Sequence, residues 1–354
     1  MRVRLAVDLR PLLEPFESGV TIYSKEMLRA LMNKKEVGLD LFYQAKQRNE
    51  KIHEWFPEVR HIPRSNSYFH LKSLFKFPLI PKDYFPVKPD LIWIPDRRPF
   101  YKSEIPLVFT VHDFVPELYP WTLSYKSRLW HKLFPLRRLL KLSKGVLCPS
   151  ETTAQKLPKK VPFAVTFEGA RLSQLMEKPS LPKKIKKKDF FLSISPMDPR
   201  KRLEWLLSAA QRFPHNNFVI AGLKKKDKRF SKLRFEQRKN IFLLPEISEE
   251  EKLWLLKNTT ALLALSRYEG FDLPVLEAVK AGTPVILSDI SVHHELYFAA
   301  GNTAKNIEDL YVLIYKALRK ELPALKSRRE LSWDKSADEA LLFFTRVIAN
   351  KNRN

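Results

Sequence analysis

Cysteine is nearly absent from this 354-residue sequence, which contains only Cys148. A single cysteine excludes an internal disulfide framework and a cysteine-rich zinc site. Long hydrophobic runs are also absent, since none approaches the roughly 20 apolar residues of a membrane-spanning helix. The first residues, MRVRLAVDLR, alternate basic and apolar side chains, which is typical of a first strand and not of a signal peptide. We therefore expect a cytoplasmic protein.

Several ligand-binding motifs are missing as well. The sequence has no Gly-x-Gly-x-x-Gly fingerprint and no P-loop, which counts against a simple dehydrogenase or ATPase. It also has no cluster of His, Asp and Glu residues with metal-ligand spacing. We therefore expect neither a metal nor a cofactor.

Acidic residues are too few to balance the basic ones. Lys plus Arg number 64 and Asp plus Glu number 39, so the formal net charge is +25. This excess favours an anionic partner, and the candidates are nucleic acid, an acidic membrane surface and a phosphorylated small molecule. A lysine-rich, solvated surface without a specific partner explains the same excess.

The hydrophobic pattern predicts two similar α/β domains. Short apolar runs alternate with stretches of helical spacing, which indicates parallel strands with helices on both faces. The predicted strands are Val3–Asp8, Leu39–Tyr43, Leu91–Ile94, Leu107–His112, Gly145–Pro149, Phe190–Ser195, Phe218–Ala221, Ile241–Leu244, Ala261–Ser266 and Pro284–Ser288. The stretch 159–188 is predicted to begin with the last strand of the N-terminal domain and to continue as a basic linker. The predicted divisions are an N-terminal domain at 1–175, a basic linker at 176–188, a C-terminal domain at 189–335, and a helix at 336–354 that crosses back to the N-terminal domain.

The segment from Ser266 to Ile286, SRYEGFDLPVLEAVKAGTPVI, carries the most chemical information. It predicts a strand end, a tight loop, and a helix that opens near Pro274. Free N–H groups at such a helix start favour an anion, and carboxylates such as Glu269 and Glu277 can accept hydrogen bonds from sugar hydroxyls. Acids near a helix start are also stabilised by its dipole whatever the function.

Part of this segment, YEGFDLPVLEAVKAGTPVI, resembles the signature of the family-4 retaining glycosyltransferases of the GT-B fold. The shared features are two glutamates separated by seven residues, the Gly-Phe-x-Leu-Pro loop and the Ala-Gly-x-Pro-Val-Ile turn. The resemblance implies that Glu277 binds the nucleotide ribose. The residues that it places at the donor sugar are Glu269, Gly270, Phe271, Asp272 and Leu273. Relatives often have glycine in place of Asp272, whose carboxylate is a candidate for selecting the sugar.

Two further segments resemble the same family. In SPMDPRKRL, Arg200 and Lys201 match a basic pair that holds the donor diphosphate, and cations there neutralise charge on a leaving phosphate. In VFTVHDF, a strand brings His112 and Asp113 to its carboxyl end, and the family's histidine lies beside the donor sugar. Gly19 opens the first helix, where relatives place a glycine-rich turn near the acceptor. A basic surface cluster and a structural histidine remain alternatives from the residues alone.

The resemblance implies two Rossmann-like parallel-sheet domains that face each other across a cleft. It implies a hexosyltransferase-type enzyme that moves a sugar, with retention, from a nucleotide-diphosphate sugar to a saccharide or lipid-linked acceptor in cell-envelope or polysaccharide synthesis. His112 and Glu269 would be catalytic, and Gly19 and Asp113 would lie on the acceptor side. The absence of an Asp-x-Asp pair agrees with a metal-independent enzyme. The alternatives are a basic nucleic-acid-binding α/β protein and a homologue that binds nucleotide sugar without turnover.

The basic excess has one concentrated region. Residues 121–144, WTLSYKSRLWHKLFPLRRLLKLSK, mix aromatic and basic side chains and contain no acid. Such a stretch suits the anionic inner face of a membrane, and it also suits stacking on single-stranded nucleic acid. An ordinary helix whose apolar side chains face the core is the third explanation. We favour membrane contact over nucleic acid, because a lipid-linked acceptor would give it a purpose.

Overall fold

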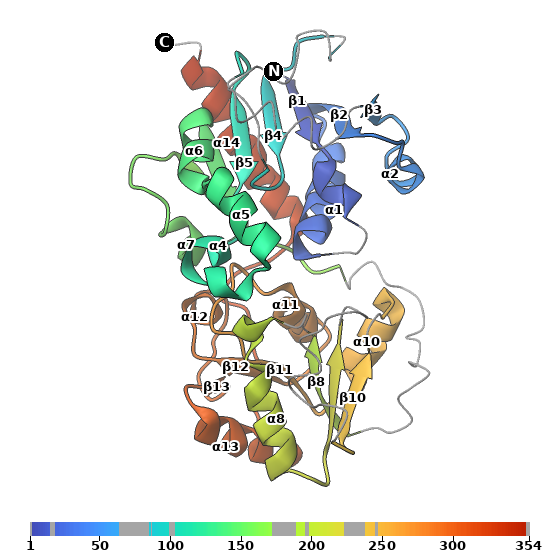
Figure 1. Cartoon of the computed structure of the whole chain (residues 1–354), viewed down its shortest axis with the longest axis vertical. Helices are drawn as coiled ribbons and strands as arrows, with labels where there is room; N and C mark the ends of the chain where they lie inside the picture. The colour runs from blue at the N-terminus through green and yellow to red at the C-terminus, as the bar shows by residue number, and fades with distance from the viewer. Residues whose placement is uncertain are drawn as a thin grey trace. The chain divides into compact units, whose positions relative to one another are not determined.

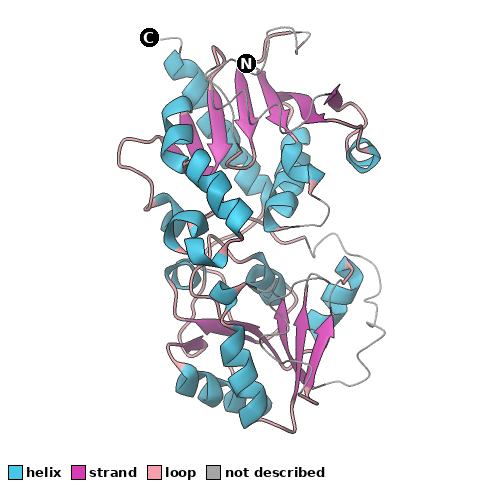
Figure 2. Ribbon diagram, in the orientation of Figure 1, coloured by secondary structure: helices cyan, strands magenta, loops and turns pink. Residues whose placement is uncertain are grey.

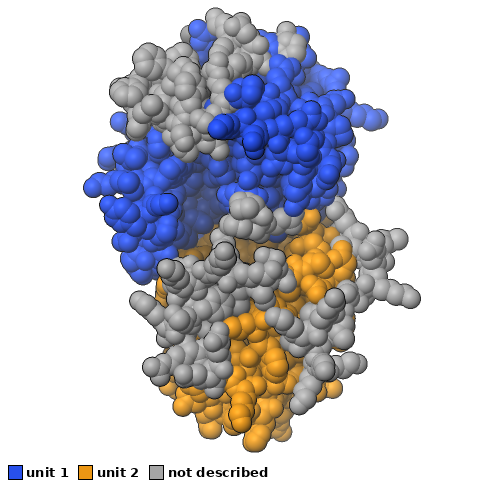
Figure 3. All heavy atoms as spheres, turned by 45° about the vertical axis from the view of Figure 1, so that its right-hand side comes forward, with its two compact units in different colours: residues 1–168, 332–354 blue, residues 169–331 orange. Residues whose placement is uncertain are grey.

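The computed structural model describes residues 2–14, 18–63, 85, 87–98, 103–171, 189–194, 198–222, 238–244 and 247–351. The chain divides into two units (Figure 3). Unit 1 comprises residues 1–168 and 332–354, and unit 2 comprises residues 169–331. Each unit is built on one parallel sheet with helices packed against it (Figure 1 and Figure 2).

The sheet of unit 1 has the strand order β3-β2-β1-β4-β5-β6-β7, and all neighbouring strands are parallel. The strands are β1 (Val3–Asp8), β2 (Val37–Ala45), β3 (Arg60–Pro63), β4 (Leu91–Ile94), β5 (Leu107–Thr110), β6 (Gly145–Cys148) and β7 (Phe163–Val165). Every residue of β4, LIWI, is buried. A central parallel strand is covered on both faces, which explains why its sequence is continuously apolar.

The helices of unit 1 cover this sheet. They are α1 (Gly19–Met32), α2 (Glu50–Trp55), α4 (Val115–Leu118), α5 (Tyr125–Leu133), α6 (Leu136–Leu142), α7 (Glu151–Ala154) and α14 (Trp333–Lys351), with short 3₁₀ helices at Arg10–Leu13 and Pro120–Thr122. The first helix starts after Ser18, whose hydroxyl accepts the N–H of Thr21 at 3.2 Å. This N-cap satisfies a backbone donor that has no partner inside the helix.

The last helix, α14, belongs to unit 1 although it follows unit 2 in the chain (Figure 1). It packs against α1 and β7. Its Asp338 pairs with Lys34 at 2.6 Å, and Ser336 donates a hydrogen bond to the carbonyl of Phe167. Gly145 permits the close approach, because a Cβ there would lie 2.5 Å from the ring of Phe343.

The sheet of unit 2 has the order β10-β9-β8-β11-β12-β13, again with parallel neighbours. The strands are β8 (Phe190–Ile194), β9 (Asn217–Ala221), β10 (Ile241–Leu244), β11 (Ala261–Ala264), β12 (Val285–Ser288) and β13 (Thr303–Ala304). The helices are α8 (Leu203–Arg212), α10 (Glu249–Asn258), α11 (Leu273–Lys280), α12 (Ser291–Leu296) and α13 (Ile307–Leu318), with a 3₁₀ helix at Pro199–Lys201.

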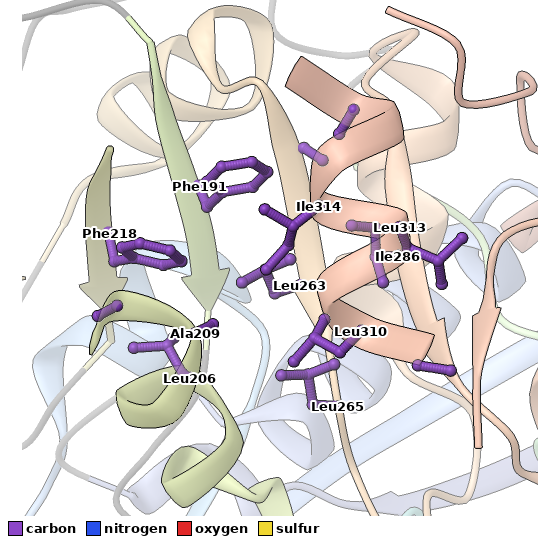
Figure 4. Close-up of a cluster of buried hydrophobic side chains, with 14 of the residues drawn as sticks. Phe191, Leu206, Ala209, Phe218, Leu263, Leu265, Ile286, Leu310, Leu313 and Ile314 are labelled. Carbon is purple, nitrogen blue, oxygen red and sulfur yellow. The ribbon is translucent and has the colours of Figure 1, made fainter. Parts of the chain in front are cut away.

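Helices α8 and α13 pack on one face of the unit 2 sheet. Figure 4 shows Phe191 and Leu263 from two strands beside Leu206 of α8 and Ile314 of α13, and all four side chains are buried. Alternate strand residues point to opposite faces, so Phe190 lies on the other side, where it stacks on Trp254 of α10. The sheet therefore has an apolar layer on each face.

The structure refines several of the predicted boundaries. Strands β1, β4 and β10 have the predicted limits, whereas β3 and β13 were not predicted. The units meet at residues 168/169 and 331/332, whereas the predicted domains ended at 175 and 335. The predicted linker at 176–188 lies outside the described residues. Among the residues that are described, no helix combines the length and the apolar content that a bilayer crossing requires.

Candidate functional site

The site in unit 2 lies at the carboxyl ends of β8 and β11. Strand β8 lies between β9 and β11 in the sheet. The chain after β8 continues to β9 on one side, and the chain after β11 continues to β12 on the other side, so the two connections diverge. Parallel sheets hold ligands at such a switch point. A pocket of about 10 Å³ is found there, and its lining includes Ser193 from β8, Ser266 after β11, Lys201 and Asp272.

Glu269 is the centre of this site. It is buried in the loop after β11, and two cations contact its carboxylate: Arg200 Nη1 lies 2.6 Å from Oε2, and Lys201 Nζ lies 2.6 Å from Oε1. The hydroxyl of Ser266 donates a hydrogen bond to Oε1 at 2.5 Å. The structure therefore brings together the basic pair and the first glutamate, which belong to separate sequence motifs.

The ionisation of Glu269 follows from these contacts. Burial alone would raise the pKa of its carboxyl group, because a charge is disfavoured away from water. Arg200 and Lys201 outweigh burial and hold that pKa well below its usual range. Glu269 is therefore an anion at neutral pH, neutralised by two cations that can also face a bound phosphate.

Local geometry explains how Arg200 reaches the loop. The carboxylate of Asp198 accepts the backbone N–H of Arg200 at 2.8 Å, which starts the 3₁₀ turn after β8. Arg202 then adopts a left-handed conformation with φ 48°, so that α8 begins in a new direction. The guanidinium of Arg200 also donates to the carbonyl of Tyr268, which fixes it to the loop that carries Glu269.

The loop residues after Glu269 are buried, and Asp272 is held in a strained conformation. Its φ is 82° and its ψ is 65°, a region that favours glycine. The Asp272 carboxylate faces inward, with Oδ2 3.1 Å from Nε2 of the buried His293. The side chains of Phe271 and Leu273 are buried as well.

The role of the Asp272 side chain in selecting the sugar stays a prediction. This side chain is only 3% exposed, and it faces His293. Sequence reasoning missed His293, because a histidine in the helix after β12 carries no local signal of this long-range contact.

The second glutamate, Glu277, is also buried on α11. Lys252 of α10, likewise missed from the sequence, lies 2.7 Å from its Oε1 and 2.9 Å from Glu249. Burial raises the pKa of Glu277. Burial alone would lower the pKa of Lys252, but the two carboxylates outweigh it and raise that pKa. Lys252 is therefore a cation beside Glu277.

The predicted residues of unit 1 lie at strand and helix ends. His112, just after β5, donates Nε2–H to the carbonyl of Pro95 at 2.8 Å, and its ring meets Tyr23 edge to face. Asp113 accepts the N–H of Val115 at 2.8 Å, so its carboxylate orders the start of α4. Gly19 opens α1, and a Cβ there would meet nothing within 4 Å.

No group of three or more metal-ligating side chains was found in the described part of the chain.

Two family models match the sequence. The model for glycosyl transferases group 1 matches residues 177–332, and the model for glycosyltransferase family 4 matches residues 18–165. Together they match most of the chain.

Curated relatives are similar over part of their length. The O-antigen chain mannosyltransferase RfbU of Salmonella typhimurium is 28% identical over 194 residues, which are 53% of this chain and 53% of that protein. The serotype-specific mannosyltransferase WbdA of Escherichia coli is 32% identical over 176 residues, which are 45% of this chain and 21% of that protein. The matched part spans about half of the first relative and about a fifth of the second.

A solved structure covers nearly the whole chain. The sucrose-phosphate synthase of Thermosynechococcus elongatus superposes with a TM-score of 0.65 at 15% identity, over 99% of this chain and 98% of that one. At this identity the likeness concerns the fold, and it confirms the predicted GT-B class of two parallel-sheet α/β domains.

Proposed function

The chain belongs to the group 1 glycosyltransferases, and on that premise we propose that it transfers a sugar from a nucleotide-diphosphate sugar to a saccharide or lipid-linked acceptor. The family models carry the premise. The observation that carries the proposal is the contact of Arg200 and Lys201 with the buried Glu269 at the switch point of the unit 2 sheet. Such a group of charges suits a ligand that joins a sugar to a diphosphate.

The cations have a role in the transfer step. When the bond between the sugar and the phosphate breaks, negative charge grows on the leaving diphosphate. A guanidinium fork and an ammonium group stabilise that charge, and they are already ordered by Glu269 and Asp198 before the donor arrives. Glu269 and the loop through Asp272 would then contact the sugar, and Glu277 the ribose.

We propose retention of configuration at the anomeric carbon. The departing phosphate takes the proton of the acceptor hydroxyl on the face where the new bond forms, through an oxocarbenium-like transition state. The protein supplies positioning and charge stabilisation in this path. His112 would lie beside the sugar, and Gly19 and Asp113 on the acceptor side. The cations already present support a metal-independent reaction.

The relatives suggest the first donor to test. Both RfbU and WbdA are named as mannosyltransferases, and RfbU acts on the O-antigen chain. We therefore propose cell-envelope polysaccharide synthesis as the setting and a mannose-bearing nucleotide as the leading donor.

The test is a thermal-shift panel of UDP-, GDP- and ADP-sugars, run with chelator on the wild type and on Glu277→Ala. One donor should raise the unfolding temperature of the wild type and fail to do so in the variant. Glu269→Gln should then keep donor affinity and lose turnover, measured as released nucleotide. Glu204→Gln is the matched control, because Glu204 is 49% exposed and forms its ion pair with Arg267, which is 47% exposed.

Two results would overturn the proposal. A wild type that shifts with no donor and instead binds RNA or DNA with steep salt dependence would favour the nucleic-acid alternative. A wild type that binds a donor but releases no nucleotide with any saccharide or lipid-linked acceptor would favour a binding homologue without turnover.

We also propose that unit 1 docks on the anionic inner face of a membrane through α5, where a lipid-linked acceptor would lie. No residue of α5 is buried. Tyr125, Leu129 and Leu133 are spaced four apart on one helix face and are 73%, 47% and 45% exposed, and Trp121 nearby is 64% exposed. This argues against the expectation of a core helix for α5, although Leu136 and Leu139 of α6 are buried as that expectation required.

Charge favours an anionic lipid surface as the occupant of this apolar face. Lys126, Arg128 and Lys132 alternate with the exposed apolar residues of α5. Each basic side chain near an anionic leaflet contributes about 1 kcal/mol. Leu129→Glu should therefore reduce co-flotation with vesicles that contain phosphatidylglycerol. Val312→Glu is the matched control, since Val312 is 56% exposed on α13 in unit 2. Equal flotation of Leu129→Glu and the wild type would remove α5 from the proposal.

A further inference from the structure

The carboxylate of Asp272 lies where its negative charge would repel the diphosphate of the proposed donor. It precedes the first residue of α11 and lines the same pocket as Lys201. An aspartate at this position of a helix usually accepts a backbone N–H of the first turn. Here the side chain makes no such hydrogen bond, so the positive end of α11 keeps no capping carboxylate.

The contacts of His293 explain this arrangement. Its Nδ1 lies 2.9 Å from the carbonyl oxygen of Ser288, and its Nε2 lies 3.1 Å from Oδ2 of Asp272. A carbonyl oxygen only accepts, so Nδ1 must donate its proton. A neutral imidazole has one N–H, which leaves Nε2 with a lone pair facing a carboxylate oxygen.

The contact between Nε2 and Oδ2 must therefore contain a second proton. That proton resides either on the ring, which gives an imidazolium and a carboxylate, or on Asp272, which gives two neutral groups. The pair has no net charge in either case. The buried ring thus cancels the charge of Asp272 and holds its side chain away from the start of α11.

We infer that His293 is a positioning residue for the donor phosphate. It keeps the carboxylate of Asp272 neutralised and turned from the helix end, so that the N-terminus of α11 and Lys201 present positive charge to the diphosphate. This inference rests on the proposed function, because it assigns His293 to the donor side of that same site.

The surrounding charges support this assignment. Ser288 donates its hydroxyl proton to the carbonyl of Ser266, and Ser266 in turn donates to Glu269. Glu269 is neutralised by its own two cations, while the neighbouring pair of His294 and Asp289 is exposed at the surface. The two carboxylates of the loop, at its positions 269 and 272, thus have separate neutralising partners.

The test compares donor affinity among variants by titration calorimetry, with GDP-mannose, UDP-glucose and inorganic pyrophosphate as probes. His293→Gln fills most of the ring's space and can donate an amide proton, but it cannot neutralise Asp272. It should weaken binding about tenfold, the effect of a charge at a partly buried helix end. Asp272→Gly tolerates φ 82° and removes the carboxylate, so it is the background in which the change at His293 is measured a second time.

The double variant His293→Gln/Asp272→Gly decides between positioning and mere packing. If His293 acts by neutralising Asp272, the double variant should bind as tightly as Asp272→Gly, because His293→Gln costs no affinity once the carboxylate is gone. His294→Gln, the matched control at the exposed neighbouring histidine, should bind like the wild type.

Each outcome bears on one claim. Unchanged affinity in His293→Gln, or a double variant that binds about tenfold more weakly than Asp272→Gly, would each overturn the role of His293. If His293→Gln fails to fold, the comparison of the double variant with Asp272→Gly still tests the inference. A wild type that binds none of the probes would instead overturn the proposed function.

Discussion

Glu269 in unit 2 and Glu168 in unit 1 have similar burial but opposite protonation. Both follow strands of a parallel sheet, β11 and β7, and their exposed fractions are 8% and 4%. Burial raises the pKa of Glu168 to about 8, so this group holds its proton at neutral pH. Two cations overcome the same effect at Glu269 and keep its pKa low.

This difference shows that burial alone does not set the charge of a carboxyl group. Cations within hydrogen-bond distance also determine this charge. Glu269, which has such cations, can accept hydrogen bonds as an anion, whereas Glu168 behaves as a neutral acid. The proposed donor site depends on the anionic case, because the carboxylate of Glu269 holds Arg200 and Lys201 at 2.6 Å.

The largest effect should come from Glu269→Ala. This change leaves two buried cations side by side without their shared anion, which costs about 3–5 kcal/mol of unfolding free energy when one member of a buried pair is lost. Urea denaturation measures the change, and turnover should vanish as well. Glu204→Ala, at an exposed pair, should cost about 1 kcal/mol or less. A loss below that of the control would contradict the comparison.

The next effect concerns Glu168 and depends on pH. Its pKa is raised from 4.5 to about 8 in the folded state, so the folded protein holds a proton that the unfolded chain releases above pH 4.5. The stabilising contribution of this proton is complete below pH 4.5 and is lost as the pH rises through about 8. Glu168→Gln cannot lose a proton, and it should match the wild type at pH 4.

Stability curves of Glu168→Gln and the wild type should therefore separate as the pH rises. The variant gains at most about 1.4 kcal/mol per pH unit over the wild type, until the difference levels off above the folded-state pKa. Thermal unfolding at several pH values measures this separation. Parallel curves from pH 4 to 9 would show that Glu168 is ionised in the fold, as Glu269 is.

A smaller effect is expected for Arg200→Ala. Lys201 remains beside Glu269 in this variant, so the carboxylate keeps one cation while its pKa rises. Donor affinity should fall by about 1.5–3 kcal/mol, the worth of a hydrogen bond to a charged group. Calorimetry against the donor chosen by thermal shift measures it. Arg267→Ala, at a 47% exposed arginine, is the control, and equal affinities of the two variants would remove Arg200 from the site.

Much of the fold could be predicted from the sequence, because buried parallel strands are continuously apolar. LIWI of β4 and IFLL of β10 have this pattern, and their limits were predicted correctly. Strand β3 was missed because RHIP is an edge strand with one buried residue, Ile62. Strand β13 was missed because it has only two residues.

The candidate site was predictable where residues lie in local motifs. Glu269 lies in the loop before α11 and Glu277 lies on that helix. Arg200 and Lys201 lie in the 3₁₀ helix that follows β8. Their partners could not be predicted, since Lys252 meets Glu277 across 25 residues and His293 meets Asp272 across 21. Such pairs are set by the packing of separate helices on one sheet, which no local pattern records.

The smallest effect should come from Ser266→Ala, which tests whether the cations alone keep Glu269 ionised. The hydroxyl of Ser266 and the ammonium of Lys201 both contact Oε1 of Glu269. If the cations keep this carboxyl ionised, loss of the hydroxyl should cost about 1 kcal/mol of unfolding free energy, as for a typical hydrogen bond. Donor affinity should stay near the wild-type value and should not fall between pH 6 and 8. An affinity that changes with pH in this range, in Ser266→Ala but not in the wild type, would mean that the hydroxyl is as necessary as the cations. Glu269 would then resemble Glu168 more closely than its two positive neighbours suggest.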